Sequence, residues 1–219
     1  MKHQSSVKSS GFTVLELMWV MFAMAVLAVL VLPGMARQKA YSSKIGCVNN
    51  LKQVGLAFRM WSGDNGDRFP MDVSTIQGGT EELVNKGEPF RHFQVLSNEL
   101  GTPKVVVCPS DGRSPATNFA SDFSDSHVSY FVGLNATLDS TNAFLSGDRK
   151  LEDDSGALSG IRDLTSKQNI GWTKPIHDDR GHIAFVDGSV NRFTTRELKK
   201  ALVSTGLATN RLAFPGGAN

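Results

Sequence analysis

The chain has 219 residues, 40% of them hydrophobic and 20% charged, which is enough for one ordinary domain and an additional segment. Its 23 basic and 21 acidic residues give a formal net charge of +2, and no Lys/Arg stripe is interleaved with aromatic residues. This balance disfavours nucleic acid as a partner. The two cysteines lack CxxC spacing, which argues against a zinc site built on thiolates.

Hydrophobic residues are concentrated near the amino terminus. From Phe12 to Leu32, 19 of 21 residues are apolar, and no lysine or arginine occurs between Lys8 and Arg37. A helix of this length spans about 32 Å, close to the ~30 Å hydrocarbon core of a bilayer. The run exceeds the roughly 7 to 15 residues of a signal-peptide core and has no clear A-x-A cleavage site, so a retained membrane anchor is the better interpretation. Basic residues flank the run equally, so charge alone does not set the orientation.

Glu16 is the one charged residue within this run. A charged side chain at the bilayer centre costs on the order of 2.5 to 3.5 kcal/mol on insertion scales. Because Glu16 lies near the start of the run, one interpretation is an interfacial carboxylate favoured by the positive end of the helix dipole. The other is a charged partner, since cleavage after Gly11 would create an ammonium on Phe12, in the same chain or in a neighbouring subunit.

The sequence Gly11-Phe12-Thr13-Val14-Leu15-Glu16 resembles the class III signal of type IV pilins and type II secretion pseudopilins. In that family a prepilin peptidase cuts after the glycine and methylates the new phenylalanine amine. The resemblance therefore implies that Gly11 ends the leader, that Phe12 becomes the mature amino terminus, and that Glu16 pairs with a terminal amine to set the register of assembly. Pro33 falls where many of these proteins carry a helix-kinking proline.

The same resemblance implies an orientation and partners. Leaders of this family are cytoplasmic and the carboxyl-terminal domains are exported, so the chain would cross the inner membrane once, with its globular domain in the periplasm. The implied partners are a prepilin peptidase, an inner-membrane assembly platform and other pilin-like subunits. The predicted organisation is a basic leader at 1–11, a transmembrane half-helix at 12–33, an amphipathic half-helix at 34–62 and an exported α+β domain at 63–219.

Beyond Pro33 the hydrophobic pattern becomes amphipathic. The proline would bend the helix without necessarily ending it. Residues spaced by four and three predict one apolar stripe that needs a sheet to cover it. The stripe consists of Cys47, Leu51, Val54, Phe58 and Trp61. The sequence Asp64-Asn65-Gly66-Asp67 then predicts the end of the helix.

The two cysteines favour a bridge between helix and sheet. Cys47 lies on the packing stripe and Cys108 ends a strand-like run. A disulfide that closes a loop of about 60 residues stabilises by ~4 kcal/mol in the chain-entropy model, if the domain lies in an oxidising compartment. Two buried thiols are the alternative.

The rest of the chain is expected to be loops on a few strands. Residues 71–160 are rich in Gly, Ser, Asn, Asp and Thr; within them we predict a helix at 91–100 closed by Gly101, and strands at 104–107 and 128–132. A two-residue turn, Asp187-Gly188, predicts a hairpin between 183–186 and 189–193. Thr194 and Glu197 then predict a capping box that opens a helix to about residue 204, which Gly206 can end.

A second resemblance lies near the carboxyl terminus. His177, followed after nine residues by Asp187-Gly188, matches the H-x9-DG motif of pseudopilin-like families in environmental bacteria. The motif is associated there with prepilin-type processing, and its biochemical role does not follow from the sequence. Other stretches that resemble this family are Asn50-Leu51-Lys52-Gln53 before Gly55-Leu56-Ala57, Cys108-Pro109-Ser110-Asp111, Ser129-Tyr130 with Asn135, and Ser146-Gly147-Asp148-Arg149.

Metal and catalytic sites are disfavoured. His177 and His182 are five residues apart, off a common strand or helix face, so a metal shared with Asp178, Asp179 or Asp187 would need a loop. The sequence Asp64-Asn65-Gly66-Asp67 lacks the spacing and terminal glutamate of an EF-hand. There is no G-x-S-x-G, P-loop or G-x-G-x-x-G sequence. We therefore predict no enzyme, no cofactor and no metal site.

The sequence as a whole predicts an α+β, pilin-like fold. A long amino-terminal helix would pack its second half on a small antiparallel sheet with long loops. The predicted function is structural, as a subunit of a type II secretion pseudopilus or a type IV pilus-like filament. The alternative is a single-span anchored periplasmic domain that binds a ligand or carries an activity and never polymerises.

Overall fold

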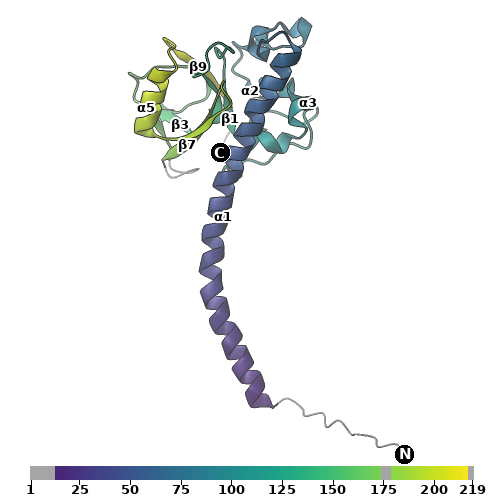
Figure 1. Cartoon of the computed structure of the whole chain (residues 1–219), viewed down its shortest axis with the longest axis vertical. Coiled ribbons are helices and arrows are strands. Elements are labelled where there is room, and N and C mark those ends of the chain that lie inside the picture. Colours follow the sequence, from purple (N-terminus) through teal and green to yellow (C-terminus); the bar gives the residue numbers. More distant parts are fainter. Residues whose placement is uncertain (1–12, 174–178, 217–219) are drawn as a thin grey trace, which may run out of the picture. The chain divides into compact units, whose positions relative to one another are not determined.

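The structure, a computed structural model, describes residues 13–173 and 179–216 (Figure 1). Gly11, Phe12 and His177, named above as site residues, lie outside the described residues. The chain forms two units, one up to Ser42 and the other from Ser43 onward. Helices and antiparallel sheets together confirm the predicted α+β class. The second unit includes the amphipathic end of the first helix together with both sheets.

Helix α1 extends from Val14 to Asp64, and Pro33 lies inside it, so the proline does not end the helix. The helix ends where the sequence predicted. The backbone N–H groups of Asn65 and Asp67 both donate to the Ser62 carbonyl, at 3.1 and 2.9 Å. Gly66 and Asp67 then take positive φ angles of 68° and 57°, which turns the chain away from the helix axis.

Over the residues that the structure describes, no helix has both the length and the apolar character needed to cross a membrane.

The main sheet has six antiparallel strands. In spatial order they are β5 (Gly160–Leu164), β9 (Asn210–Phe214), β1 (Tyr130–Gly133), β2 (Phe144–Asp148), β7 (Arg180–Phe185) and β8 (Val190–Thr194). A second sheet consists of β4 (Gly156–Ala157), β3 (Leu151–Asp153) and β6 (Gly171–Trp172). The sheet edges are β5 and β8, so β8 pairs on one side only.

Short helices fill the segment between α1 and the sheet. They are η1 (Pro70–Asp72), η2 (Thr75–Gln77), η3 (Glu81–Leu83), α2 (Pro89–Gln94), α3 (Ser97–Leu100), η4 (Pro103–Val106) and η5 (Asp125–His127). The helix predicted at 91–100 is thus two shorter helices, and Gly101 ends the second with a φ of 68°. The strand predicted at 104–107 is wrong. Pro103 and the Thr102 cap, whose hydroxyl accepts the Lys104 N–H, start a 3-10 turn there.

Alternate residues of the sheet enter two separate cores. On β1, Tyr130 and Val132 face the core that contains α1, whereas Phe131 faces the core that contains α5 (Thr195–Ser204). The same alternation separates Ala213 from its neighbours on β9. The sheet therefore lies between two helical layers, and both of its faces are covered.

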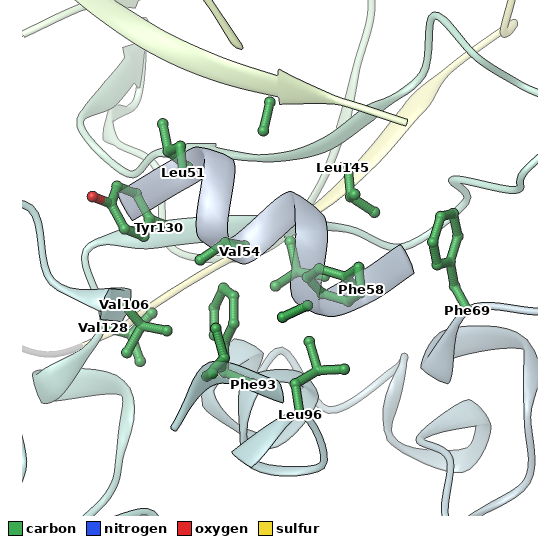
Figure 2. Packing of buried hydrophobic residues seen from close by; sticks show 14 of the residues in the cluster. Leu51, Val54, Phe58, Phe69, Phe93, Leu96, Val106, Val128, Tyr130 and Leu145 are labelled. Atoms are coloured by element: carbon green, nitrogen blue, oxygen red, sulfur yellow. The ribbon is translucent and has the colours of Figure 1, made fainter. Parts of the chain in front are cut away.

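The α1 stripe predicted from the sequence is buried. Cys47, Leu51, Val54 and Phe58 are fully buried, and Trp61 is 6% exposed. Figure 2 shows Leu51, Val54 and Phe58 projecting from α1 among side chains of other elements. The Phe58 ring meets the rings of Phe69 and Phe93 edge-on, with centroids 6.0 and 6.1 Å apart (Figure 2).

The β7–β8 hairpin is present, with a longer turn than predicted. The Gly188 N–H donates to the Phe185 carbonyl at 3.0 Å, and the Phe185 N–H donates to the Ser189 carbonyl at 2.9 Å. Three residues, 186–188, therefore form the loop, and Gly188 takes a φ of 88°. The predicted two-residue Asp187-Gly188 turn is corrected accordingly.

Helix α5 starts at the predicted capping box. The Thr194 side chain accepts the Glu197 N–H at 3.3 Å, and the Glu197 carboxylate accepts the Thr194 N–H at 2.8 Å. The helix ends at Ser204, as predicted, and Gly206 follows with a φ of 72°.

Candidate functional site

The first turn of α1 holds Glu16 in a second capping box. The Glu16 carboxylate accepts the Thr13 N–H at 2.8 Å and the Thr13 hydroxyl at 3.0 Å, and the Thr13 hydroxyl oxygen accepts the Glu16 N–H at 3.3 Å. Both of these carboxylate contacts use one oxygen, Oε2. Within the described residues Oε1 accepts no hydrogen bond, so both interpretations of Glu16 fit this geometry.

The side chains that follow Glu16 are exposed. Every residue from Thr13 to Val29 is exposed, including Trp19 at 66% and Phe22 at 63%. Rings of these two residues meet edge-on, with centroids 6.1 Å apart. The first unit therefore presents a helix whose apolar side chains have no cover within the described chain.

In the second unit, Cys47 and Cys108 form a disulfide with a Cα–Cα distance of 4.9 Å. Both residues are fully buried. The bond joins α1 to the segment after η4, and the Asn50 side chain adds a hydrogen bond from its Nδ2 to the Val107 carbonyl at 2.8 Å. The disulfide and this hydrogen bond fix the start of the buried stripe against the rest of the domain.

Asp111, three residues after the disulfide, forms a buried ion pair. Arg149 donates from Nε and Nη2 to the two Asp111 carboxylate oxygens, at 2.8 and 3.0 Å. The Asp111 side chain is 1% exposed and that of Arg149 11%. Burial alone would raise the pKa of Asp111, but the hydrogen bonds and charge of Arg149 outweigh burial and hold that pKa below its ordinary value.

Asp148, the residue before Arg149, pairs with His182 and so joins strands β2 and β7. Asp148 Oδ2 accepts the His182 backbone N–H at 2.7 Å and lies 3.1 Å from His182 Nδ1. The two residues are 1% and 3% exposed. Burial, followed by the Asp148 charge, raises the pKa of Tyr130 well above its ordinary value. His182 is thus engaged with a residue that the metal hypothesis did not include.

Arg113 adds a third basic group that the sequence did not single out. Its guanidinium donates to the carbonyls of Asp125, Val128 and Gly216, the last at 2.9 Å. Burial, followed by the charge of Arg149, lowers its pKa to about 10. An arginine in a Gly/Ser-rich loop gives no local signal of this role, because its partners lie 12 to 103 residues away.

The Asp187-Gly188 turn contacts the exposed side of α1. Arg59 Nη1 donates to the Asp187 carbonyl at 2.9 Å. A Cβ at Gly188 would lie 3.1 Å from the same Nη1 atom, so the glycine provides both a positive φ and room for the guanidinium. Asn135 has a separate role, since its side chain joins Thr209 and Arg211 near β9.

The family-like stretches therefore meet around one buried polar network beside the disulfide. Asn50, Asp111 and Arg149 belong to it, and Asp148, next to Arg149, pairs with His182. The Ser129 backbone joins η4 to the residue after β2 by hydrogen bonds with Val106 and Arg149. Its charges are paired rather than open to a substrate. Among residues 13–173 and 179–216, no group of three or more His, Cys, Asp or Glu residues could hold a metal ion. The arrangement stabilises the fold around α1.

No protein-family model matches the chain, and searches of curated proteins and of solved structures found no match either.

Proposed function

We propose that this chain is a pilin-like structural subunit. A prepilin peptidase would remove the leader after Gly11 and methylate Phe12, and an inner-membrane platform would add the subunit to a type II secretion pseudopilus or a type IV pilus-like filament. The segment 12–33 would be stored in the membrane before assembly. This span extends at both ends beyond the side chains that the structure describes.

The observation that supports the proposal is the uncovered apolar surface at the start of α1. All side chains from Thr13 to Val29 are exposed, and only Thr13 and Glu16 among them are polar. Soluble monomers rarely leave contiguous apolar patches of this kind in water. A bilayer in the stored subunit, and equivalent helices in a filament, would each supply the missing cover.

Glu16 gives this surface a register. A carboxylate among packed apolar helices is costly unless it has a charged partner. The Oε2 atom already accepts hydrogen bonds from Thr13 at the start of the helix. The Oε1 atom would form an ion pair with the Phe12 ammonium of an adjacent subunit. Because each subunit would offer one carboxylate and one amine to different neighbours, the contact is heterologous and the assembly stays open-ended.

The substitution Glu16→Ala tests the proposal. In cells that contain the assembly machinery, we expect normal membrane insertion and cleavage but loss of filaments, measured by fractionation, mass analysis of the amino terminus, and electron microscopy of sheared filaments. Glu16→Asp is the matched control, since it retains the charge and should retain part of the assembly.

Two results would contradict the proposal. Unchanged assembly of the Glu16→Ala protein would remove the pairing role, and an intact Met1 beside an active prepilin peptidase would remove the processing step. The second result would favour a single-span anchored periplasmic domain that does not polymerise. A net charge of +2 without a basic stripe gives no support to nucleic acid as a partner.

A further inference from the structure

A groove of about 420 Å³ lies between the edge strand β8 and helix α5. None of its lining residues belongs to α1 or to the buried network. Its volume falls in the range of small-molecule sites, roughly 300 to 1,000 Å³. The lining residues are Asn142, Phe185, Asp187, Ser189, Asn191, Phe193, Glu197, Lys200, Ala201 and Ser204.

Two periodic stripes form the walls of the groove. Ser189, Asn191 and Phe193 alternate along the strand and so share one face of the sheet. On α5 the lining residues from Glu197 to Ser204 recur at steps of three and four, so they share one face of the helix. The groove therefore follows from how α5 folds back on β8, rather than from a loose surface loop.

The floor of the groove is aromatic. Phe185 is 7% exposed and Phe193 is half-buried, and their ring centroids are 5.9 Å apart in an edge-on arrangement. An aromatic face carries partial negative charge, which attracts the partly positive C–H bonds of a ring lying on it. Phe193 thus offers an apolar platform within an otherwise polar groove.

Two exposed asparagines, Asn142 and Asn191, line the groove, and within the described residues their side-chain amides form no hydrogen bond with another protein group. Each amide has two N–H donors and one acceptor oxygen, so together they suit a ligand that both donates and accepts hydrogen bonds. Hydroxyl groups have this property.

A peptide added along the β8 edge would not use this groove. Phe185 and Ser189 form a hydrogen-bonded pair, so the alternation of an antiparallel ladder turns the backbone groups of Val190 and Arg192 away from β7. Neither of these residues lines the groove. A ligand in the groove would meet side chains rather than the open backbone edge.

Anionic ligands are disfavoured by charge. Asp187 and Glu197 line the groove against one basic residue, Lys200. Hydrogen bonds from Thr194 are the main cause of the lowered pKa of the Glu197 carboxyl group. The charge of Lys200 lowers this pKa by a smaller amount. The groove therefore has no cationic excess for a phosphate or sulfate group.

We propose that this groove binds a neutral saccharide, with one sugar ring on Phe193 and its hydroxyl groups on Asn142 and Asn191. Residues 189–193 span about 13 Å of extended strand, which suits one or two sugar rings. The site does not depend on the filament proposal, since it uses residues of the second unit alone.

The test is saturation-transfer NMR on the purified full chain in a zwitterionic detergent without a sugar headgroup. The neutral probes are cellobiose, maltose and N,N′-diacetylchitobiose; a sulfated disaccharide and an uncharged blocked tetrapeptide are the comparison probes. We expect at least one neutral disaccharide to bind, and Asn191→Ala to weaken it roughly 3- to 10-fold, as for one lost hydrogen bond. Arg192→Ala is the matched control, because its side chain lies on the opposite face of β8 and outside the groove.

Several outcomes would overturn the proposal. They are binding of none of the three neutral disaccharides, binding of the sulfated sugar or the peptide alone, and equal affinities for the Asn191→Ala and Arg192→Ala proteins. If Asn191→Ala does not fold, judged by thermal unfolding, Asn142→Ala provides the same measurement from an exposed position outside the strand.

Discussion

From Val14 to Val29 every side chain of α1 is exposed, whereas between Cys47 and Trp61 the same helix buries a complete apolar stripe. The exposed half is the more hydrophobic of the two, and polar residues separate the apolar ones only in the buried half. Hydrophobicity alone therefore does not determine which half of α1 the rest of the chain covers. An amphipathic stripe fits one sheet face, whereas a helix that is apolar all round needs cover on every side.

Substitution of matched phenylalanines in the two halves should separate them most strongly. Phe58→Ala removes a fully buried ring and should lower the free energy of unfolding of the second unit by about 3 to 5 kcal/mol. Phe22→Ala removes a ring that is 63% exposed and should change it by less than about 0.5 kcal/mol. Denaturant unfolding followed by tryptophan fluorescence measures both, and similar losses would contradict the comparison.

The disulfide marks where burial of α1 begins, and its removal should have the next largest effect. The Cys47→Ala/Cys108→Ala double variant releases a cross-link between residues 61 positions apart. We expect a loss of about 2 to 4 kcal/mol, because the unfolded chain regains loop entropy. Reduced wild-type protein should unfold like the double variant. Peptide mass analysis that finds both thiols open to alkylation without reductant would refute the bond.

Acid should destabilise the second unit through a buried histidine on helix α2. His92 is 1% exposed with Nδ1 2.7 Å from the Thr80 hydroxyl, and burial lowers its pKa to about 4. The unfolded chain takes up this proton first, so stability should fall as pH drops from about 6.5 to about 4, by up to about 3 kcal/mol. His92→Asn should remove this part of the pH dependence.

A background variant isolates the histidine. Burial raises the pKa of Asp125 to about 6, so the folded state holds this proton longer and stability falls as pH rises through the same range. The two groups therefore have opposite signs. Unfolding curves at several pH values, with and without His92→Asn in an Asp125→Asn background, measure the histidine alone. An unchanged slope after His92→Asn would contradict the assignment.

Local patterns predicted several elements well. Spacing by three and four identified the α1 stripe, and the Thr194 and Glu197 pair located the start of α5, because each feature depends on residues within two helical turns. The strand predicted at 104–107 failed because Pro103 and Thr102 favour a helical turn more strongly than the valines favour a strand. Strand β2 was not predicted, since Ser146-Gly147-Asp148 is polar enough to resemble a loop.

The candidate site was predicted only as fragments. The stretches around Asp111 and Asp148 were noted for resemblance alone, and no pattern paired them with Arg149 and His182. The paired residues are 34 and 38 positions apart in the sequence. At such separations the spacing of two residues does not indicate whether they are close in space. Arg113 and the β8–α5 groove had no signal for the same reason.

By itself, the sequence determined the periodicities of α1, the capping boxes, the turn positions and the α+β class, because these depend on interactions between near neighbours along the chain. Only the tertiary structure decided whether the two cysteines bridge and which carboxylates and basic groups meet. Burial makes an unpaired charge costly, so the folded core selects partners from distant strands. It also decided that α5 would leave a groove beside β8, since that space depends on how a helix and an edge strand pack together.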